Sequence, residues 1–464
     1  MKKTKTDDRA LHAAILALWG IVNVWIAHGR SAWMDELARY EEVATPVKAG
    51  LKTLLEEASP FVPGELLLGY VARGLFSRVA TEEVWGRLPS LLFGGLTLWL
   101  ALRMRKPVVA AVVFFSAAVT AYSTEFRPYS ALLFAGALSF FLLWERKRKL
   151  TRFESALTWF TIFFTHLYGI CFVGMACFFR RDWAKAAAAA LYVVAFLGVY
   201  MSYHHGGVGD WTVPAQFPGW GGTIKQTLGN LANPHKASYL IAPLFAVGAW
   251  RLWAAGERER LGWLALLLAV TIGAPMLAVV VGRYVFYPRQ IVGAVFPFLF
   301  VAALGLEWLA ARARLPKLAL PAGTAVMAVT WFLTSVLHVP PFVNVAFHTY
   351  NRTLQHAVAA GSRNIFIFDI AGTFKFYLPR RLGREKSSEM LKAYGMTLLK
   401  QCWENGACTY SLQDSKFMWG GEDALVTSKD FDAFLRDRAF AIDRIIYGMP
   451  RLALETPIPS ERTF

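Results

Sequence analysis

Side chains able to bind a phosphate and to move a proton occur repeatedly near the ends of long apolar runs. A carboxylate can take a proton from an attacking hydroxyl, and a guanidinium can hold a phosphate through two charge-assisted hydrogen bonds. Residues of these types stand in well-separated segments: Asp35 and Glu36, Glu125 and Arg127, His166 and Tyr168, and Arg283 and Arg289. Together they predict a site for a phosphate-bearing donor and a hydroxyl acceptor.

Each of these residues alone also has a structural interpretation. Arg127 could extend its charge to the membrane surface, His166 could bond a backbone carbonyl, and Asp35 could cap the helix that follows it. The chemical interpretation is favoured for the set, because distant segments bring carboxylates, guanidiniums and an imidazole to one interfacial layer.

The composition indicates the surroundings of this site. Of 464 residues, 56% are hydrophobic and 17% are charged, whereas a soluble domain carries about 25% charged residues. Apolar stretches of about 17 to 25 residues recur between Leu11 and Val339, as membrane-spanning helices require. The sequence therefore predicts a polytopic α-helical membrane protein rather than a soluble enzyme or a disordered chain.

The net charge of +17 is explained by topology, so no nucleic-acid partner is expected. Lys and Arg concentrate in cytoplasmic loops of membrane proteins. Here they dominate six short segments: Met1–Ala10, Arg103–Lys106, Glu145–Arg152, Arg180–Lys185, Arg251–Arg260 and Arg312–Lys317. Placing all six inside the cell predicts about eleven spans, near 11–28, 87–102, 107–123, 128–144, 154–167, 168–179, 186–203, 238–251, 261–281, 290–310 and 318–338. The N-terminus is then cytoplasmic and the C-terminus extracytoplasmic, in a bacterial inner membrane or a plasma membrane.

The opposite face receives two long segments. The first loop, 29–86, has apolar residues three to four apart with a break at Pro46, which predicts short amphipathic helices along the membrane surface; a merely packed loop is the equal alternative. The tail turns more polar, and we expect a small extracytoplasmic α/β domain over 340–464 after a transmembrane domain over 1–339. Within the tail, Asn364–Ile370 has a strand pattern and Lys429–Arg438 a helical one.

The four cysteines and the pair His204 and His205 carry little chemistry. Cys171 and Cys177 lie in an apolar run and are expected to be buried, whereas Cys402 and Cys408 could pair outside the cytoplasm. His204 and His205 with Asp210 are a weak metal candidate in a glycine-rich loop. We therefore expect no required cofactor, and a divalent metal stays possible without support from the sequence.

The order of several short motifs resembles a known group of enzymes. Asp35-Glu36, Arg87-Leu88-Pro89-Ser90, Glu125-Phe126-Arg127-Pro128-Tyr129-Ser130, Thr165-His166-Leu167-Tyr168, and Arg289 followed by Pro297 are similar to motifs of GT-C glycosyltransferases. The resemblance is to the branch of protein O-mannosyltransferases and lipid A aminoarabinose transferases. It covers about residues 1–310, with a looser match in Thr373–Pro379.

The resemblance implies a GT-C-like fold and inverting transfer of a sugar from a polyprenyl-phosphate donor to an extracytoplasmic protein, lipid or glycan. It implies Asp35 as the catalytic carboxylate with Glu36 beside it, and Arg127 and Arg289 as donor-phosphate ligands. Residues implied to line the site are Arg87, Glu125, Tyr129, His166 and Tyr168.

The chain departs from the pattern in two places. Pro60 and Pro63 are separated where the family often has adjacent prolines, and Arg289 is followed by glutamine while Arg283 precedes a tyrosine. Which arginine holds the phosphate is left open, as are the sugar, the acceptor, the oligomeric state and the pairing of Cys402 with Cys408. The alternative functions are a transporter or lipid flippase and a non-catalytic scaffold.

Overall fold

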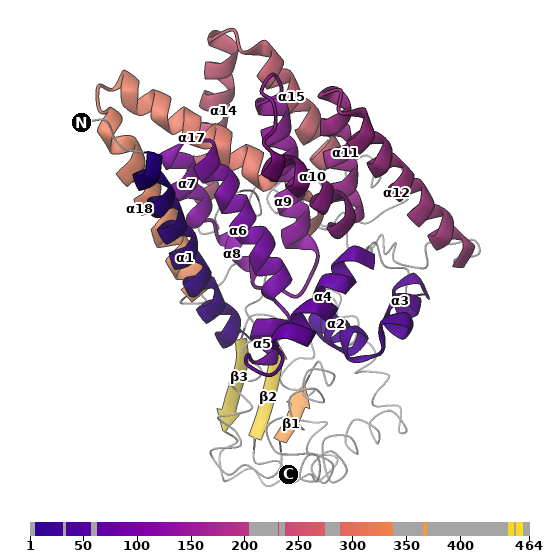
Figure 1. The fold of residues 1–464 in the computed structure, drawn as a ribbon. Coiled ribbons are helices and arrows are strands. Elements are labelled where there is room, and N and C mark those ends of the chain that lie inside the picture. Colours follow the sequence, from indigo (N-terminus) through magenta and orange to yellow (C-terminus); the bar gives the residue numbers. More distant parts are fainter. Residues whose placement is uncertain are drawn as a thin grey trace. The chain divides into compact units, whose positions relative to one another are not determined.

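A computed structural model of the chain describes residues 5–30, 34–56, 63–203, 231, 237–273, 288–336, 365–368, 444–449 and 452–457 (Figure 1). The chain forms two compact units. One comprises Met1–His28 and Arg39–Val345, and the other comprises Gly29–Ala38 and Ala346–Phe464. Each unit is described by itself below.

The first unit is helical throughout its described part. Its helices, some of which begin or end in the second unit, are α1 (Lys5–Gly29), α2 (Met34–Ala44), α3 (Val47–Glu56), α4 (Pro63–Phe76), α5 (Glu82–Trp85), α6 (Leu88–Arg103), α7 (Pro107–Phe114), α8 (Ala117–Ser123), α9 (Tyr129–Trp144), α10 (Arg152–Phe164), α11 (Leu167–Phe179), α12 (Trp183–Tyr203), α14 (Ala237–Ala254), α15 (Arg258–Leu268), α17 (Val295–Arg312) and α18 (Ala319–Trp331). Shorter helical turns are η2 (Ala269–Gly273), η3 (Pro288–Ala294), η4 (Pro316–Leu318) and η5 (Phe332–Val336).

Helices occupy part or all of every predicted apolar segment, with one interruption that the sequence did not reveal. The expected single span over 107–123 is two helices, because α7 ends at Phe114 and Ser116 caps α8 by accepting a hydrogen bond from the N–H of Val119. Within the described residues, Arg9–Gly29 and Ile291–Arg312 are long and apolar enough to cross a membrane, and several shorter apolar helices accompany them. The count of eleven spans stays a prediction.

The first loop contains the short helices that its periodicity predicts. The chain breaks between α2 and α3 at Thr45–Pro46, where proline cannot continue the preceding helix. Helices α4 and α5 complete the segment. That these helices lie along a membrane surface remains an expectation.

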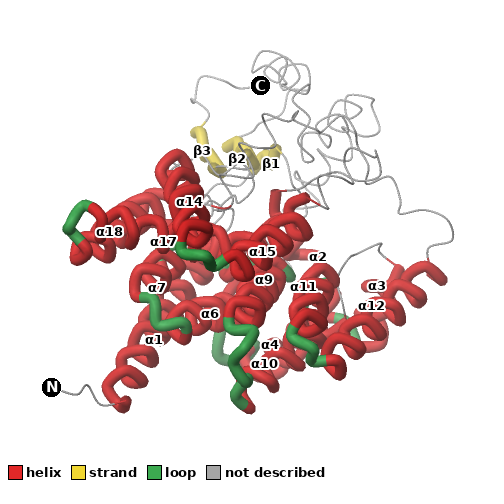
Figure 2. Tube along the Cα trace, turned by 90° about the horizontal axis from the view of Figure 1, so that it is seen from above, coloured by secondary structure: helices red, strands yellow, loops and turns green. Residues whose placement is uncertain are grey.

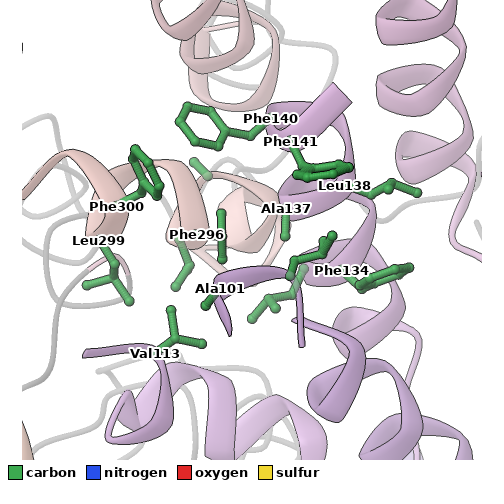
Figure 3. Close-up of a cluster of buried hydrophobic side chains, with 14 of the residues drawn as sticks. Ala101, Val113, Phe134, Ala137, Leu138, Phe140, Phe141, Phe296, Leu299 and Phe300 are labelled. Atoms are coloured by element: carbon green, nitrogen blue, oxygen red, sulfur yellow. The ribbon is translucent and has the colours of Figure 1, made fainter. Parts of the chain in front are cut away.

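Helix α9 forms the centre of the first unit (Figure 1). Its residues from Tyr129 to Leu143 are all buried, as expected for a helix that is apolar on every side. Side chains of α9 pack against those of α17, with contributions from α6 and α7 (Figure 3). Phe140, for example, lies 5.0 Å from Phe300 between ring centroids. The core therefore surrounds the helix whose first residue is the predicted site residue Tyr129.

Glycines bring backbones into contact at two places in this core. A Cβ atom at Gly136 of α9 would overlap the carbonyl oxygen of Gly293 in η3. A Cβ atom at Gly305 of α17 would overlap the carbonyl oxygen of Leu244 in α14. Only glycine permits such close approach, so these residues fix how α9, α14 and α17 pack.

The predicted basic loops meet at one end of the helices. The guanidinium of Arg180, just after α11, donates hydrogen bonds to the carbonyls of Leu142, Glu145 and Arg148 at 2.7, 2.8 and 2.6 Å. These carbonyls lie at the C-terminal end of α9 and in the turns after it, where such groups lack helical partners. Loop Arg180–Lys185 therefore lies against loop Glu145–Arg152.

Ion pairs join further basic loops to the same end. Arg148 and Arg103 donate to the buried carboxylate of Glu154 at 2.7 and 3.2 Å. Arg146 donates to Glu259 at 2.9 Å, and this bond lowers the pKa of the Glu259 carboxyl. Figure 2, viewed from above Figure 1, draws the connecting loops in green. Contacts made by Arg103, Arg146, Arg148 and Arg180 thus bring four of the six basic segments to the same end of the helices.

The second unit contains a small sheet in its described part. Strands β1 (Ile365–Phe368), β2 (Arg444–Met449) and β3 (Leu452–Pro457) lie in that order, with β1 parallel to β2 and β2 antiparallel to β3. Strand β1 confirms the pattern seen in Asn364–Ile370. The helix expected over 429–438 and the pair Cys402 and Cys408 lie outside the described residues, so the α/β domain stays a prediction.

One expected burial is wrong. Cys177 is buried, but Cys171 is exposed on α11. The two residues are six positions apart, and six helical steps of about 100° place them on different faces. Apolar neighbours in sequence alone did not distinguish the two faces.

Candidate functional site

The segment that carries Arg127 is fixed by hydrogen bonds on both sides. The hydroxyl of Ser90, in α6, donates to the carbonyl of Arg127 at 3.2 Å, and the hydroxyl of Ser130, in α9, donates to the carbonyl of Ser90 at 2.6 Å. Glu125 is buried in the same segment. Two hydroxyls therefore hold the short connection between α8 and α9 against α6.

His166 lies between α10 and α11, outside both helices. Its Nδ1 atom accepts a hydrogen bond from the N–H of Tyr168 at 3.2 Å, which makes His166 the N-cap of α11. Because Nδ1 is the acceptor, a neutral ring carries its proton on Nε2. The imidazole lies at 29° to the ring of Tyr129 and at 39° to that of Tyr168, with centroid distances of 6.4 and 5.1 Å.

Arg127 joins this group from the other connection. Its Cζ atom is 5.6 Å from the centroid of the Tyr129 ring, within the range of a cation–π interaction. The structure thus brings four predicted residues together, Arg127, Tyr129, His166 and Tyr168, which we call the Arg127–His166 cluster. The Arg127 guanidinium brings a positive charge to this cluster.

An aromatic group supports the same segment from α2 and α5. The ring of Tyr40 lies 5.0 Å from that of Phe126 and 5.4 Å from that of Trp85, in edge-to-face arrangements. The hydroxyl of Tyr40 also donates to the carbonyl of Glu82 at 2.7 Å. Because Phe126 immediately precedes Arg127, α2 is packed against the segment that carries this arginine.

Arg87 has a contact that its implied role does not include. It is fully buried, and its guanidinium donates to the carbonyl of Ala27 at 2.6 Å. That carbonyl belongs to the last turn of α1, where carbonyls have no partner within the helix. Arg87 therefore fastens the end of α1 to the start of α6.

The remaining predicted residues are placed only in part. Asp35 and Glu36 lie in the first turn of α2, and Glu36 is buried. Arg289 belongs to η3. The side chains of Asp35 and Arg289, and all of Arg283, lie outside the described parts. Among the described residues, no group of three His, Cys, Asp or Glu side chains could hold a metal ion.

The sequence analysis missed the residues that hold the cluster in place. Ser90 and Ser130 each lie within one of the short motifs named above. A serine beside a buried charged segment could have indicated a hydrogen bond from its hydroxyl to a backbone carbonyl. No sequence pattern indicates the contact between Tyr40 and Phe126, because these residues are far apart in the sequence.

Comparison with known proteins gives one similar structure. No protein-family model matches the chain, and no curated protein matches it. The crystal structure of ArnT from Cupriavidus metallidurans bound to undecaprenyl phosphate is similar, with a TM-score of 0.49 and 13% sequence identity over 87% of this chain and 92% of that one. Because the TM-score is below 0.5, no argument rests on this match.

Proposed function

We propose that this chain is a membrane glycosyltransferase. It transfers a sugar, with inversion, from a polyprenyl-phosphate donor to an extracytoplasmic acceptor, and the reaction needs no cofactor. Asp35 acts as the catalytic carboxylate with Glu36 beside it. Arg127 binds the donor phosphate together with Arg289 or Arg283, and Glu125, Tyr129, His166, Tyr168 and Arg87 surround the site.

The observation that carries the proposal is the position of the Arg127–His166 cluster along α9. The cluster lies at the first residue of this 16-residue helix, and the basic loops meet at its last turn. At 1.5 Å per residue the two groups are about 24 Å apart along the axis, close to the hydrocarbon thickness of about 30 Å. With the basic loops in the cytoplasm, the cluster lies near the outer surface of the membrane.

That position suits a lipid-linked donor. A polyprenyl tail stays in the bilayer, so its phosphate meets a protein at the boundary of the hydrocarbon. A single guanidinium among aromatic rings can hold the phosphate and stabilise the charge that it gains as the sugar leaves. Because Nδ1 of His166 accepts from the N–H of Tyr168, a neutral imidazole can donate from Nε2.

Support for Asp35 comes from the order of the motifs and from the chemistry of the acceptor. An acceptor hydroxyl is a weak nucleophile near neutral pH, and a carboxylate that accepts its proton accelerates the attack. A carboxylate at the start of α2 would supply this base.

A transporter or flippase is the alternative, and the cluster's position disfavours it. Transporters bind their substrates near the middle of the membrane, between repeated halves. The cluster instead lies at helix ends.

The direct test is reconstitution of the purified chain in lipid nanodiscs. Synthetic polyprenyl-phosphate sugars are supplied with candidate acceptors, lipid A, a peptide and a glycan, and mass spectrometry detects free polyprenyl phosphate and the glycosylated product. We expect release of polyprenyl phosphate coupled to product, with the product anomer opposite to that of the donor. Movement of an intact donor across vesicle bilayers without any sugar transfer would instead identify a flippase.

A further inference from the structure

Three tryptophans and two arginines lie at the ends of α14 and α17 and at the start of α15. Trp250 and Trp253 lie on one face of α14, and the ring of Trp250 is 5.0 Å from that of Trp308 in α17. Arg258 lies over the ring of Trp253 at 5.4 Å, and Arg312 lies over the ring of Trp308 at 5.5 Å. We call these five residues the Trp–Arg row.

The row is exposed although it is largely aromatic. Trp250 and Trp253 are 53% and 59% exposed. In water such surface is unfavourable, but at the boundary between hydrocarbon and headgroups amphipathic indole rings are enriched. The row therefore faces a medium that accepts both rings and charges.

The row lies at the same end as the basic loops. Arg258 is the first residue of α15, and its neighbour Glu259 is paired with Arg146 of the loop after α9. The row thus occupies the cytoplasmic boundary if the chain spans a membrane as proposed.

The nearby carboxylates are paired with other cations. Glu257 accepts from Arg260 at 3.1 Å, Glu259 contacts Arg146 and Lys147, and Glu307 faces Lys106 at 3.6 Å. Within the described residues, the contacts recorded for the Arg258 and Arg312 guanidiniums are with tryptophan rings. Both arginines therefore retain hydrogen-bond donors for an external anion.

We propose that the Trp–Arg row binds the headgroup of an anionic phospholipid in the cytoplasmic leaflet. Arg258 and Arg312 donate to the lipid phosphate oxygens, while the indole rings contact the glycerol and the first carbons of the acyl chains. Anionic lipids attract arginines at this boundary, and a ring behind each guanidinium restricts its orientation. The proposal rests on the membrane placement above, and it is independent of sugar transfer.

The test compares two double variants of the full chain that remove equal charge from the same end. Arg258→Ala with Arg312→Ala disrupts the row. Lys149→Ala with Arg152→Ala is the matched control, because both residues are exposed in a basic loop outside the row. Each protein is placed in nanodiscs of phosphatidylcholine and phosphatidylglycerol, and native mass spectrometry counts the retained lipids of each class.

We expect the wild type and the control to retain phosphatidylglycerol preferentially. In the row variant, the preference for phosphatidylglycerol should fall about fivefold for each arginine removed. If both variants lost this preference equally, the lipids would be attracted by the overall charge and not by the row. If the wild type showed no preference, the row would bind no anionic lipid. Either result overturns the proposal.

A second measurement uses the unmodified protein, in case the row variant does not fold. A photoactivatable phosphatidylglycerol is cross-linked in the nanodisc, and the labelled peptides are mapped. Labelling concentrated in residues 250–258 and 308–312 supports the proposal, and labelling spread evenly over all the basic loops contradicts it. Neither measurement involves a sugar donor, so failure here is distinct from failure of the proposed transfer.

Discussion

The N–H of Tyr168 donates to Nδ1 of His166 at 3.2 Å, so the imidazole that caps α11 also faces the aromatic rings of the Arg127–His166 cluster. One side chain thereby ends the connection between α10 and α11 and contributes to the candidate site. Changes at His166 should therefore affect stability and activity by different physical routes.

Two variants at His166 separate these effects. His166→Asn keeps an oxygen that can cap α11, whereas His166→Ala removes the cap. In detergent, thermal unfolding should show a loss of about 0.5–2 kcal/mol for His166→Ala and a smaller loss for His166→Asn. An identical loss in both variants would contradict the assignment.

Arg127→Ala should reduce kcat/KM for the lipid-phosphate donor by about ten- to hundredfold, the value of a hydrogen bond to a charged group. Arg152→Ala, which removes an equal charge near the other end of the first unit, should leave kcat/KM unchanged. The structural alternative is that Arg127 forms an ion pair with Glu125. If adding Glu125→Ala to Arg127→Ala restored activity, the pair would be structural and the phosphate role would be wrong.

Asp35→Asn should lower turnover on a hydroxyl acceptor by about a hundred- to ten-thousandfold while donor binding persists. Glu36→Gln should have the smaller effect, because adjacent residues of a helix point in different directions. Turnover and donor binding are measured separately on purified protein with a synthetic polyprenyl-phosphate sugar. Near-normal turnover of Asp35→Asn on every acceptor would exclude Asp35 as the catalytic residue.

Gly305→Ala should destabilise the packing of α14 against α17. The added methyl group would overlap the carbonyl oxygen of Leu244, and such overpacking costs about 1–3 kcal/mol. Gly262→Ala is the matched control, because a Cβ atom there meets nothing within 4 Å and alanine favours the helix. Thermal unfolding of the two variants in the same detergent should shift in opposite directions. A lower melting temperature for both would indicate a general sensitivity to substitution.

The orientation can be checked by labelling single cysteines in intact cells. A cysteine at position 414 in the tail should react with an impermeant reagent, and one at Lys149 in a basic loop should react only after the membrane is opened. If position 414 were labelled only in opened cells, the orientation would be the reverse of the one predicted. The proposed site would then lie on the cytoplasmic side.

The apolar pattern predicts the helices well because burial and membrane insertion act on whole segments. The break before α3 at Pro46 and strand β1 followed from local chemistry. The division of 107–123 into α7 and α8 did not, because Phe115 and Ser116 interrupt the helix without proline or glycine. The sequence also named Arg127, Tyr129, His166 and Tyr168, which the structure brings together. It could not show that Arg87 fastens α1, since that bond joins residues sixty positions apart.

The three hydrogen bonds of Arg180 have a consequence for how the chain is assembled during synthesis. Helix α9 is made before Arg180, which follows the carbonyls that it binds by 32 to 38 residues. Until Arg180 has been synthesised, the carbonyls of Leu142, Glu145 and Arg148 lack its guanidinium as a donor. The C-terminal end of α9 can therefore be fastened to the end of α11 only after α11 has been made, so this contact should form late during synthesis.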